Sequence, residues 1–174
     1  MILFVSQLIG IAAVGLYLLS YQLKKRKQIV WATCISNAFY VLQYVLLGAF
    51  SGAVMDTLST VGSFLAGKKN SPLFRRYSRW FALLCFSLIT VSGVVIAAVR
   101  RDWIELIPIV GALLQTGGLW FEDEQTIRKF GLSAAPFWLV YNIISRAYGA
   151  AIGSMLAIVS SLIAILRYRK NKEI

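Results

Sequence analysis

The sequence has no histidine, only two cysteines and only seven acidic residues among its 174. The absence of histidine excludes an imidazole proton relay and a haem ligated through histidine. Cys34 and Cys85 each lie inside an apolar run and lack the spacing of metal ligands. We therefore interpret both as free thiols that pack as small hydrophobic side chains, and we expect neither a metal nor a cofactor.

Polar stretches are also scarce. The chain is 59% hydrophobic and 14% charged, with a mean hydropathy of +0.72. Soluble domains average about 25% charged and about 45–50% apolar residues. Many of the apolar runs lack the polar face that a helix of a soluble protein presents to water. These features predict an all-α, multi-pass membrane protein, with the lipid bilayer as its first partner.

Positive charge is abundant, with 18 Lys and Arg and a net charge of +11. These residues form short clusters at the ends of apolar runs, which is typical of loops on the cytoplasmic side of a membrane. We therefore expect no nucleic-acid partner. We also expect no enzyme, because no serine has a histidine partner and Asp56 has no second carboxylate at a useful spacing.

The longest apolar region runs from Ile29 to Ala66, with Asp56 as its only charged residue. It is long enough for two membrane spans of roughly 20 residues each, divided by an uncharged turn at Gly48–Gly52. Across the chain, the apolar runs predict seven spans: Ile2–Leu23, Gln28–Leu47, Gly52–Ala66, Trp80–Val99, Trp103–Phe121, Phe130–Ala147 and Gly149–Leu166. A six-span alternative stays open if the short third or seventh run is re-entrant.

The basic clusters also predict the orientation of the chain. With the N-terminus outside and the C-terminus inside, the inner side receives the clusters at 24–27 and 68–79 and the mixed loop at 122–129. The basic tail, which contains Arg167, Arg169, Lys170 and Lys172, joins them there. The outer side receives the neutral turn at 48–52 and few unbalanced charges.

Two parts of the chain share an order of features at an offset of about 97–98 residues. The segment Leu42–Ala53 compares with Leu139–Ala150, and Ile9–Ala13 compares with Ile107–Gly111. With one span between two three-span units, both units have the same orientation and are related by an axis along the membrane normal. The predicted division is 1–67 for the first unit, 68–101 for a basic loop and linker helix, and 102–174 for the second unit and tail.

This three-one-three layout resembles the SWEET and PQ-loop superfamily, and within it the chain is most similar to the YgjV family of bacterial inner-membrane proteins. The residues that carry the resemblance are Glu105-Leu-Ile-Pro-Ile-Val-Gly, the turn at Gly48–Gly52 and the Arg167-Tyr-Arg-Lys ending. The resemblance implies a multi-pass protein of the bacterial inner (plasma) membrane, with a substrate site near the midplane between the units.

The chain departs from this superfamily at two motifs. Tyr21-Gln22 and Leu119-Trp120 occupy the places of the Pro-Gln pair that names the PQ-loop group. Thr60 and Ala157 occupy the places where SWEETs have an asparagine. Sugar recognition therefore does not carry over to this chain.

Asp56 is the most unusual residue of the predicted spans. A carboxylate inside a span costs about 2.5–3.5 kcal/mol on insertion scales and usually faces the bundle interior or water. Asp56 is therefore a candidate proton or cation site, or a hydrogen-bond acceptor for substrate. The alternative is a carboxylate near a helix start at the wet interface, where the helix dipole favours it.

Aromatic and amide side chains repeat at helical spacing in the second and sixth spans. Together with Asp56, the candidate substrate pocket consists of Asn37, Tyr40, Gln43, Tyr44, Thr60, Trp138, Tyr141 and Asn142. Ring faces and amides suit a neutral, partly apolar solute, through stacking and hydrogen bonds. The alternative is that the aromatic residues anchor the helices at the interface and the amides hold helix to helix.

Opposite charges occupy the corresponding inner loops of the two units. Lys24, Lys25 and Arg26 lie in the first, and Glu122, Asp123 and Glu124 in the second. We interpret them as a candidate ionic latch that closes the inner mouth of a pore. The alternative is that the basic residues only follow the topology rule while the acids pair with Arg128 and Lys129.

These observations favour a small carrier that moves a neutral or weakly polar, sugar-like or vitamin-like solute by alternating access. Facilitated diffusion is the expected mechanism, because Asp56 is the one intramembrane group that offers coupling. A vitamin carrier of the nicotinamide riboside type shares the layout and is the alternative within transport. A non-transporting receptor or scaffold of the PQ-loop type is the alternative from another class. The sequence specifies no oligomeric state.

Overall fold

The computed structural model describes residues 2–170, with side chains as far as residue 167. Met1 and Lys172 lie outside the described residues, as do the side chains of Arg169 and Lys170 in the predicted basic tail. Within residues 2–170 the chain forms helices and turns and no strand. The elements are α1 (Ile2–Gln22), α2 (Arg26–Leu47), α3 (Phe50–Lys68), α4 (Pro72–Arg75), α5 (Ser78–Arg100), the 3-10 turn η1 (Trp103–Leu106), α6 (Ile107–Gly118), α7 (Glu124–Ile144) and α8 (Tyr148–Lys170).

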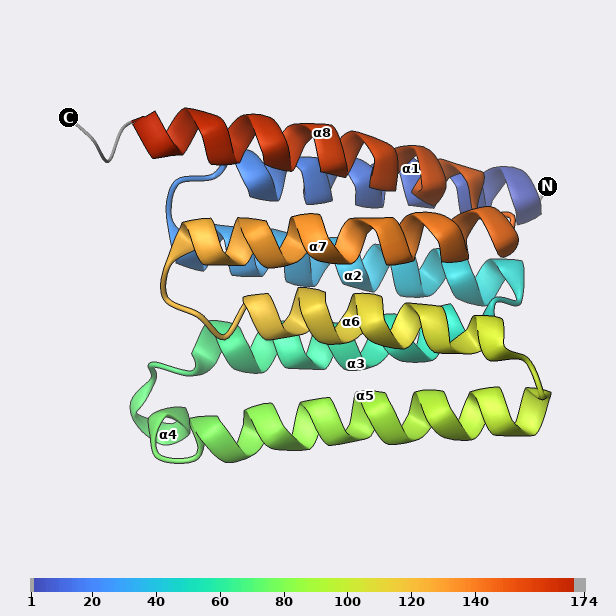
Figure 1. Cartoon of the computed structure of the whole chain (residues 1–174), viewed down its shortest axis with the longest axis horizontal. Coiled ribbons are helices and arrows are strands. Elements are labelled where there is room, and N and C mark those ends of the chain that lie inside the picture. The colour runs from blue at the N-terminus through green and yellow to red at the C-terminus, as the bar shows by residue number, and fades with distance from the viewer. Residues whose placement is uncertain (1, 171–174) are drawn as a thin grey trace.

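The long helices run along one common direction and form two layers (Figure 1). One layer holds α1, α2 and α3 in that order, and the other holds α8, α7 and α6. The layers meet where α1 packs on α8 and α3 packs on α6, and α5 closes the edge beside α3 and α6. The backbones of α2 and α7 approach each other less closely, so long side chains fill the centre of the molecule.

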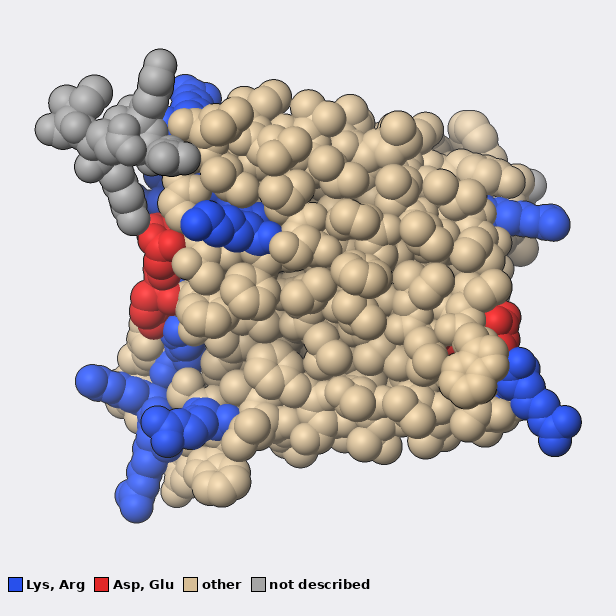
Figure 2. All heavy atoms as spheres, viewed as in Figure 1, with Lys and Arg blue, Asp and Glu red and all other residues tan. Residues whose placement is uncertain are grey.

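Charged side chains gather at the two ends of this bundle and leave an uncharged band between them (Figure 2). We call the end with the connections 23–25, 69–77 and 119–123 the basic end. The opposite end has the turns at 48–49, 101–102 and 145–147. Among the described residues, four helices are long and apolar enough to cross a membrane by length and composition, namely α1, α2, α5 and residues Tyr148–Arg167 of α8. The apolar segment Trp103–Gly118 is shorter.

Polar residues lie inside the bundle and apolar residues cover its outside. Asn37, Gln43 and Asp56 are 0–3% exposed, whereas Leu83, Val91 and Val95 on α5 are more than half exposed. This distribution is the one a bilayer requires, since lipid tails solvate apolar side chains and offer no hydrogen bonds. The exposed apolar surface of α5 is therefore explained by lipid.

Some helix ends differ from the sequence prediction because capping residues determine where those helices begin or end. Asp123 accepts a hydrogen bond from the Thr126 amide at 2.8 Å and starts α7 at Glu124, six residues before the predicted Phe130. The polar first turns of α7 hid this start from a hydropathy reading. Gly48 follows α2 with a φ of +69°, a conformation that glycine adopts without strain, and it reverses the chain into α3.

Glycines allow close contact where the layers meet. A Cβ on Gly62 of α3 would meet the side chain of Thr116 on α6 at 2.6 Å, and one on Gly153 of α8 would overlap Val14 on α1. Contacts this close between helices are typical of membrane bundles, in which small residues let the backbones approach. The two lateral seams are therefore tight, whereas the centre between α2 and α7 leaves room for a cavity.

Candidate functional site

A small polar cavity lies at the centre of the bundle, between the two layers. The six helices of those layers all contribute to its lining, which consists of Tyr17, Tyr40, Tyr44, Asp56, Gln115, Ala135, Trp138, Asn142 and Ser154. About 20 Å³ of it can hold the centre of a water molecule. That volume accommodates about one water. The accessible space is therefore far smaller than a sugar or a vitamin.

Asp56 is the one charged residue among those that line this cavity. It lies about 9 Å from the first residue of α3, given a rise of about 1.5 Å per residue, and it is 3% exposed. Within residues 2–167 its carboxylate makes no hydrogen bond and no ion pair, but it interacts electrostatically with Tyr17, Tyr40 and Tyr44. The structure thus places Asp56 in the bundle interior and not at a wet helix start.

An aromatic cluster joins α2 to α7 beside the carboxylate. The Tyr44 ring centroid lies 6.4 Å from that of Trp138 and 6.0 Å from that of Tyr141. The Tyr44 hydroxyl donates a hydrogen bond to Oδ1 of Asn142, and Asn142 Nδ2 donates to Ser154 Oγ at 3.1 Å. This chain of contacts links α2, α7 and α8 across the centre of the molecule.

Tyr141 takes part in the closure of the opposite end and does not line the cavity. Its hydroxyl accepts a hydrogen bond from the Gly52 amide at 2.8 Å and lies 2.7 Å from Ser51 Oγ. Ser51 in turn donates to Glu105, which pairs with Arg100 at 3.0 Å. The start of α3 is thereby tied to α7 and to η1, a contact that the sequence analysis did not predict.

Three other predicted pocket residues lie away from the cavity. Asn37 Oδ1 accepts a hydrogen bond from Gln115 Nε2 at 2.8 Å, and so it positions a side chain that lines the cavity. Thr60 donates to the Asp56 backbone carbonyl at 2.7 Å. Gln43 is fully buried and lies against Gly10, with no hydrogen-bond partner for either atom of its amide. The structure adds Tyr17, Gln115, Ala135 and Ser154, which were not predicted.

A second small cavity lies between the central one and the basic end. Its lining is Tyr17, Ser20, Tyr21, Ile29, Thr33, Gln115, Leu119, Ile127, Arg128 and Gly131. Tyr17 and Gln115 line both cavities and thus lie between them. The Tyr17 hydroxyl accepts a hydrogen bond from Tyr21 at 2.8 Å, and Asn37 holds Gln115, so both dividing side chains are fixed by neighbours.

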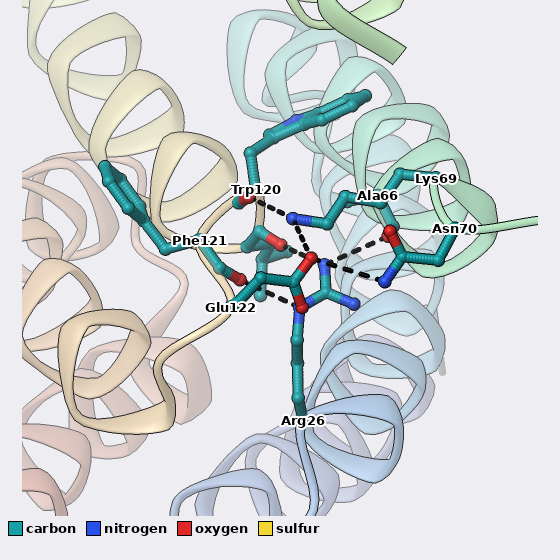
Figure 3. A network of polar contacts seen from close by, with 8 residues as sticks. Arg26, Ala66, Lys69, Asn70, Trp120, Phe121 and Glu122 are labelled. Carbon is teal, nitrogen blue, oxygen red and sulfur yellow. Dashed lines mark hydrogen bonds and ion pairs between the residues drawn. The ribbon is translucent and has the colours of Figure 1, made fainter. Parts of the chain in front are cut away.

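A polar network closes the basic end (Figure 3). The Arg26 guanidinium donates to the carbonyls of Leu119 and Phe121 at 2.8 Å each, and to that of Ala66 at 3.1 Å. Glu122 pairs with Arg26 at 3.4 Å and with Lys69 at 2.8 Å. Lys69 also donates to the carbonyl of Trp120, and Asn70 donates to Glu122 at 3.3 Å. The network joins α2, the end of α3 and the α6–α7 loop.

Lys69 lowers the pKa of Glu122 below its ordinary value of 4.5, chiefly through the hydrogen bond it donates. The contribution of ionised Glu122 to the stability of the fold is therefore complete above its ordinary pKa. This contribution is lost as the pH falls through the lowered pKa of the folded protein. The Glu122 side chain is 63% exposed. Because exposed pairs contribute only about 0–1 kcal/mol each, the two ion pairs of Glu122 add little to the stability of this network.

Arg128 on α7 bonds the last carbonyls of α1, much as Arg26 on α2 bonds the last carbonyls of α6. Its side chain is 2% exposed and donates to the carbonyls of Tyr21 at 3.1 Å and Leu23 at 2.8 Å. Arg26, at the start of α2, thus caps the end of α6, and Arg128, near the start of α7, caps the end of α1. Cations at helix C-termini are favourable because the last carbonyls lack partners.

The predicted latch residues have different roles in the structure. Arg26 and Glu122 form an ion pair, whereas Asp123 caps α7 and Glu124 lies in its first turn. Lys24 and Lys25 are exposed. The sequence analysis assigned Lys69 only to a topological cluster and Arg128 only to pairing with the nearby acids. Neither position has a sequence signal that shows its contact across the bundle.

Charged ends, an uncharged outer band and buried polar groups around a central cavity define a multi-pass helical membrane protein. The model of a family of bacterial inner membrane proteins, Imp-YgjV, matches residues 4–172, and the chain belongs to this family. The protein is thus located in the bacterial inner membrane, as the sequence resemblance implied. No curated protein and no solved structure matches the chain significantly.

Replacing Tyr44 by Phe should destabilise the fold measurably. The change removes the hydroxyl that bonds Asn142 and leaves the ring contacts in place. Hydrogen bonds between membrane helices contribute about 0.6 kcal/mol on average and about 1.7 kcal/mol at most. We expect a fall in Tm of about 1–5 °C in detergent. The control is Tyr148→Phe, since Tyr148 is 59% exposed. Equal Tm values for Tyr44→Phe and the parent protein would contradict this role.

Proposed function

We propose that this protein is a small carrier that moves a solute across the inner membrane by alternating access. The central observation is a polar cavity to which all six helices of the two layers contribute, with closing contacts on both of its sides. A carrier that works by alternating access passes through a form that is closed on both sides. Transport of this kind requires no catalytic residue. A receptor or scaffold needs no polar cavity, which favours the carrier.

The proposal includes seven spans, grouped as two parallel three-helix units with residues 68–101 as loop and linker. In support, α1, α2 and α3 have the same directions as α6, α7 and α8, and each unit follows the other's order around the centre (Figure 1). Tyr44 and Tyr141 occupy equivalent places in the repeated segments, and their ring centroids lie 6.0 Å apart. Equivalent residues come this close only near the axis that relates the units.

The orientation in this proposal follows the charges. The basic end carries the clusters at 24–27 and 68–79, and Figure 2 shows most of the visible Lys and Arg there. Positively charged connections are retained on the cytoplasmic side. The N-terminus then lies outside and the C-terminus inside, and Arg26, Lys69 and Glu122 close the cytoplasmic mouth.

The lining suggests how a solute is held. Tyr44 and Trp138 offer ring faces for stacking, and Asn142 and Gln115 offer amides, which suits a small polar solute with an apolar part. A solute larger than water requires the two units to separate at one end while the other stays closed. We propose facilitated diffusion, since the cavity has a single charged group.

Uptake into proteoliposomes tests the carrier directly. Vesicles with the purified protein are incubated in a metabolite mixture, and the internal solutes are identified by mass spectrometry. We expect one or a few solutes to accumulate above the level in protein-free vesicles. Trp138→Ala should reduce this uptake at least tenfold because it removes a wall of the cavity, whereas Leu42→Ala, on a side chain that is 53% exposed, should not. A folded protein that admits no solute would support the receptor alternative.

The ionic latch makes a separate prediction. With Cys34 and Cys85 replaced by Ala, Thr33→Cys places a thiol in the lining of the cavity nearest the basic end. Adding Glu122→Lys should raise its rate of labelling by a polar thiol reagent several-fold, because it sets a third cation against Arg26 and Lys69. Adding Glu124→Lys instead is the comparison, and we expect a smaller effect, since Glu124 interacts with Arg26 without forming an ion pair with it. Equal rates for both variants and the parent would exclude the latch.

A further inference from the structure

The central cavity contains one carboxyl group, that of Asp56, and no Lys or Arg among the residues that line it. Asp56 is 3% exposed, and the other residues that line the cavity are neutral. A buried charge without a partner costs several kcal/mol, so a carboxylate here is stable only with a counter-ion or a proton. We propose that Asp56 is the counter-ion for the ammonium group of the solute, so that the cavity selects small organic amines in their cationic form.

The aromatic side chains around Asp56 favour an organic cation. The ring of Tyr44 is nearly parallel to those of Tyr40 and Trp138, at centroid distances of 6.3 Å and 6.4 Å and interplanar angles of 26° and 18°. All three residues line the cavity. The negative faces of aromatic rings attract ammonium groups, and more strongly where water is excluded. A cation beside Asp56 therefore has both a carboxylate and ring faces as neighbours.

A metal ion fits this lining less well. Hard cations such as Mg²⁺ and Ca²⁺ take six or more oxygen ligands, and residues 2–167 contain no cluster of three or more His, Cys, Asp or Glu side chains that could hold a metal ion. Two neutral oxygens of the lining already have partners, since Asn142 Oδ1 accepts from Tyr44 and Tyr17 Oη accepts from Tyr21. An ammonium group needs fewer acceptors, because it donates only three hydrogen bonds and the rings complete its surroundings.

The division between the two cavities limits the length of the solute. Tyr17 and Gln115 line both cavities, so a movement of these two side chains would join them into one elongated site. Asp56 would lie at one end of this site. Further along, the apolar Ile29, Leu119 and Ile127 line it together with polar residues, among them the buried cation Arg128, which would repel an ammonium group placed at that end. A linear amine would then bind with its charged head on Asp56 and its apolar chain towards the basic end.

Equilibrium dialysis with radiolabelled butylammonium tests the inference on the full chain in detergent, at constant ionic strength. We expect saturable binding at one site, competition by unlabelled butylammonium, and no competition by 1-butanol, a neutral compound of similar size. Asp56→Asn should weaken binding at least tenfold. The matched control Glu124→Gln removes a carboxylate outside the cavity and should leave binding unchanged. Asp56→Asn removes an uncompensated charge, so its Tm should equal or exceed that of the parent.

Three results would overturn the inference. Competition by 1-butanol as strong as by butylammonium would show that charge is not recognised. Displacement by sodium chloride at equal ionic strength would assign Asp56 to an inorganic cation. A lack of saturable binding to the folded parent protein would indicate that Asp56 is neutralised by a proton and not by an organic cation. The solute class rests on the proposed carrier function, but the two can fail separately. Uptake of a neutral solute without amine binding contradicts only this inference, and amine binding without flux of any solute contradicts only the carrier.

Discussion

In a bilayer, a buried polar group must find its partner inside the helix bundle, because the lipid tails offer none. The centre of this protein depends on that constraint. Tyr44, Asn142 and Ser154 satisfy one another in a chain that joins α2, α7 and α8. Asp56 lies beside this chain, and its carboxylate has no hydrogen-bond or ion-pair partner within residues 2–167. The same constraint therefore holds the two layers together and leaves one charge available for a ligand.

The two ends of the bundle are closed by different means. At the basic end, Arg26 and Arg128 each reach from one layer to the last carbonyls of a helix in the other. Glu122 adds exposed ion pairs that cost little to break. At the opposite end, Tyr141 and Glu105 tie the start of α3 to the second half of the chain through mostly buried groups. In the proposed carrier, the exposed ion pairs of Glu122 make the basic end, which lies over the second cavity, the end expected to open more easily.

The membrane class and most helix positions were predictable, because hydropathy and basic clusters depend on local sequence. Tyr40 and Tyr44 on α2 and Trp138 and Asn142 on α7 line the central cavity, and these residues were found from their helical spacing. Asp56 lines it from α3 and was found because it is a charge within an apolar run. Gln115 and Tyr17 were missed because the prediction rested on the aromatic and amide stripes of the second and sixth spans, and both residues lie on other helices. Gln43 shares the stripe of Tyr44 but lies against Gly10, because the stripe is wide enough to meet two neighbouring helices. The spacing of residues along a helix shows which of them share a face of that helix. The packing of the helices determines which neighbours that face contacts.

The central claim is that the two three-helix units move against each other about the contact between α2 and α7. Distances between spin labels in proteoliposomes test it most directly, in a chain without Cys34 and Cys85. One pair, Lys27→Cys with Lys129→Cys, reports on the basic end, and the other, Leu46→Cys with Ile144→Cys, on the opposite end; all four positions are exposed. The account predicts that a transported solute shifts the two distance distributions in opposite directions. Distributions that stay single and unchanged with every solute tested, in folded protein, would contradict it.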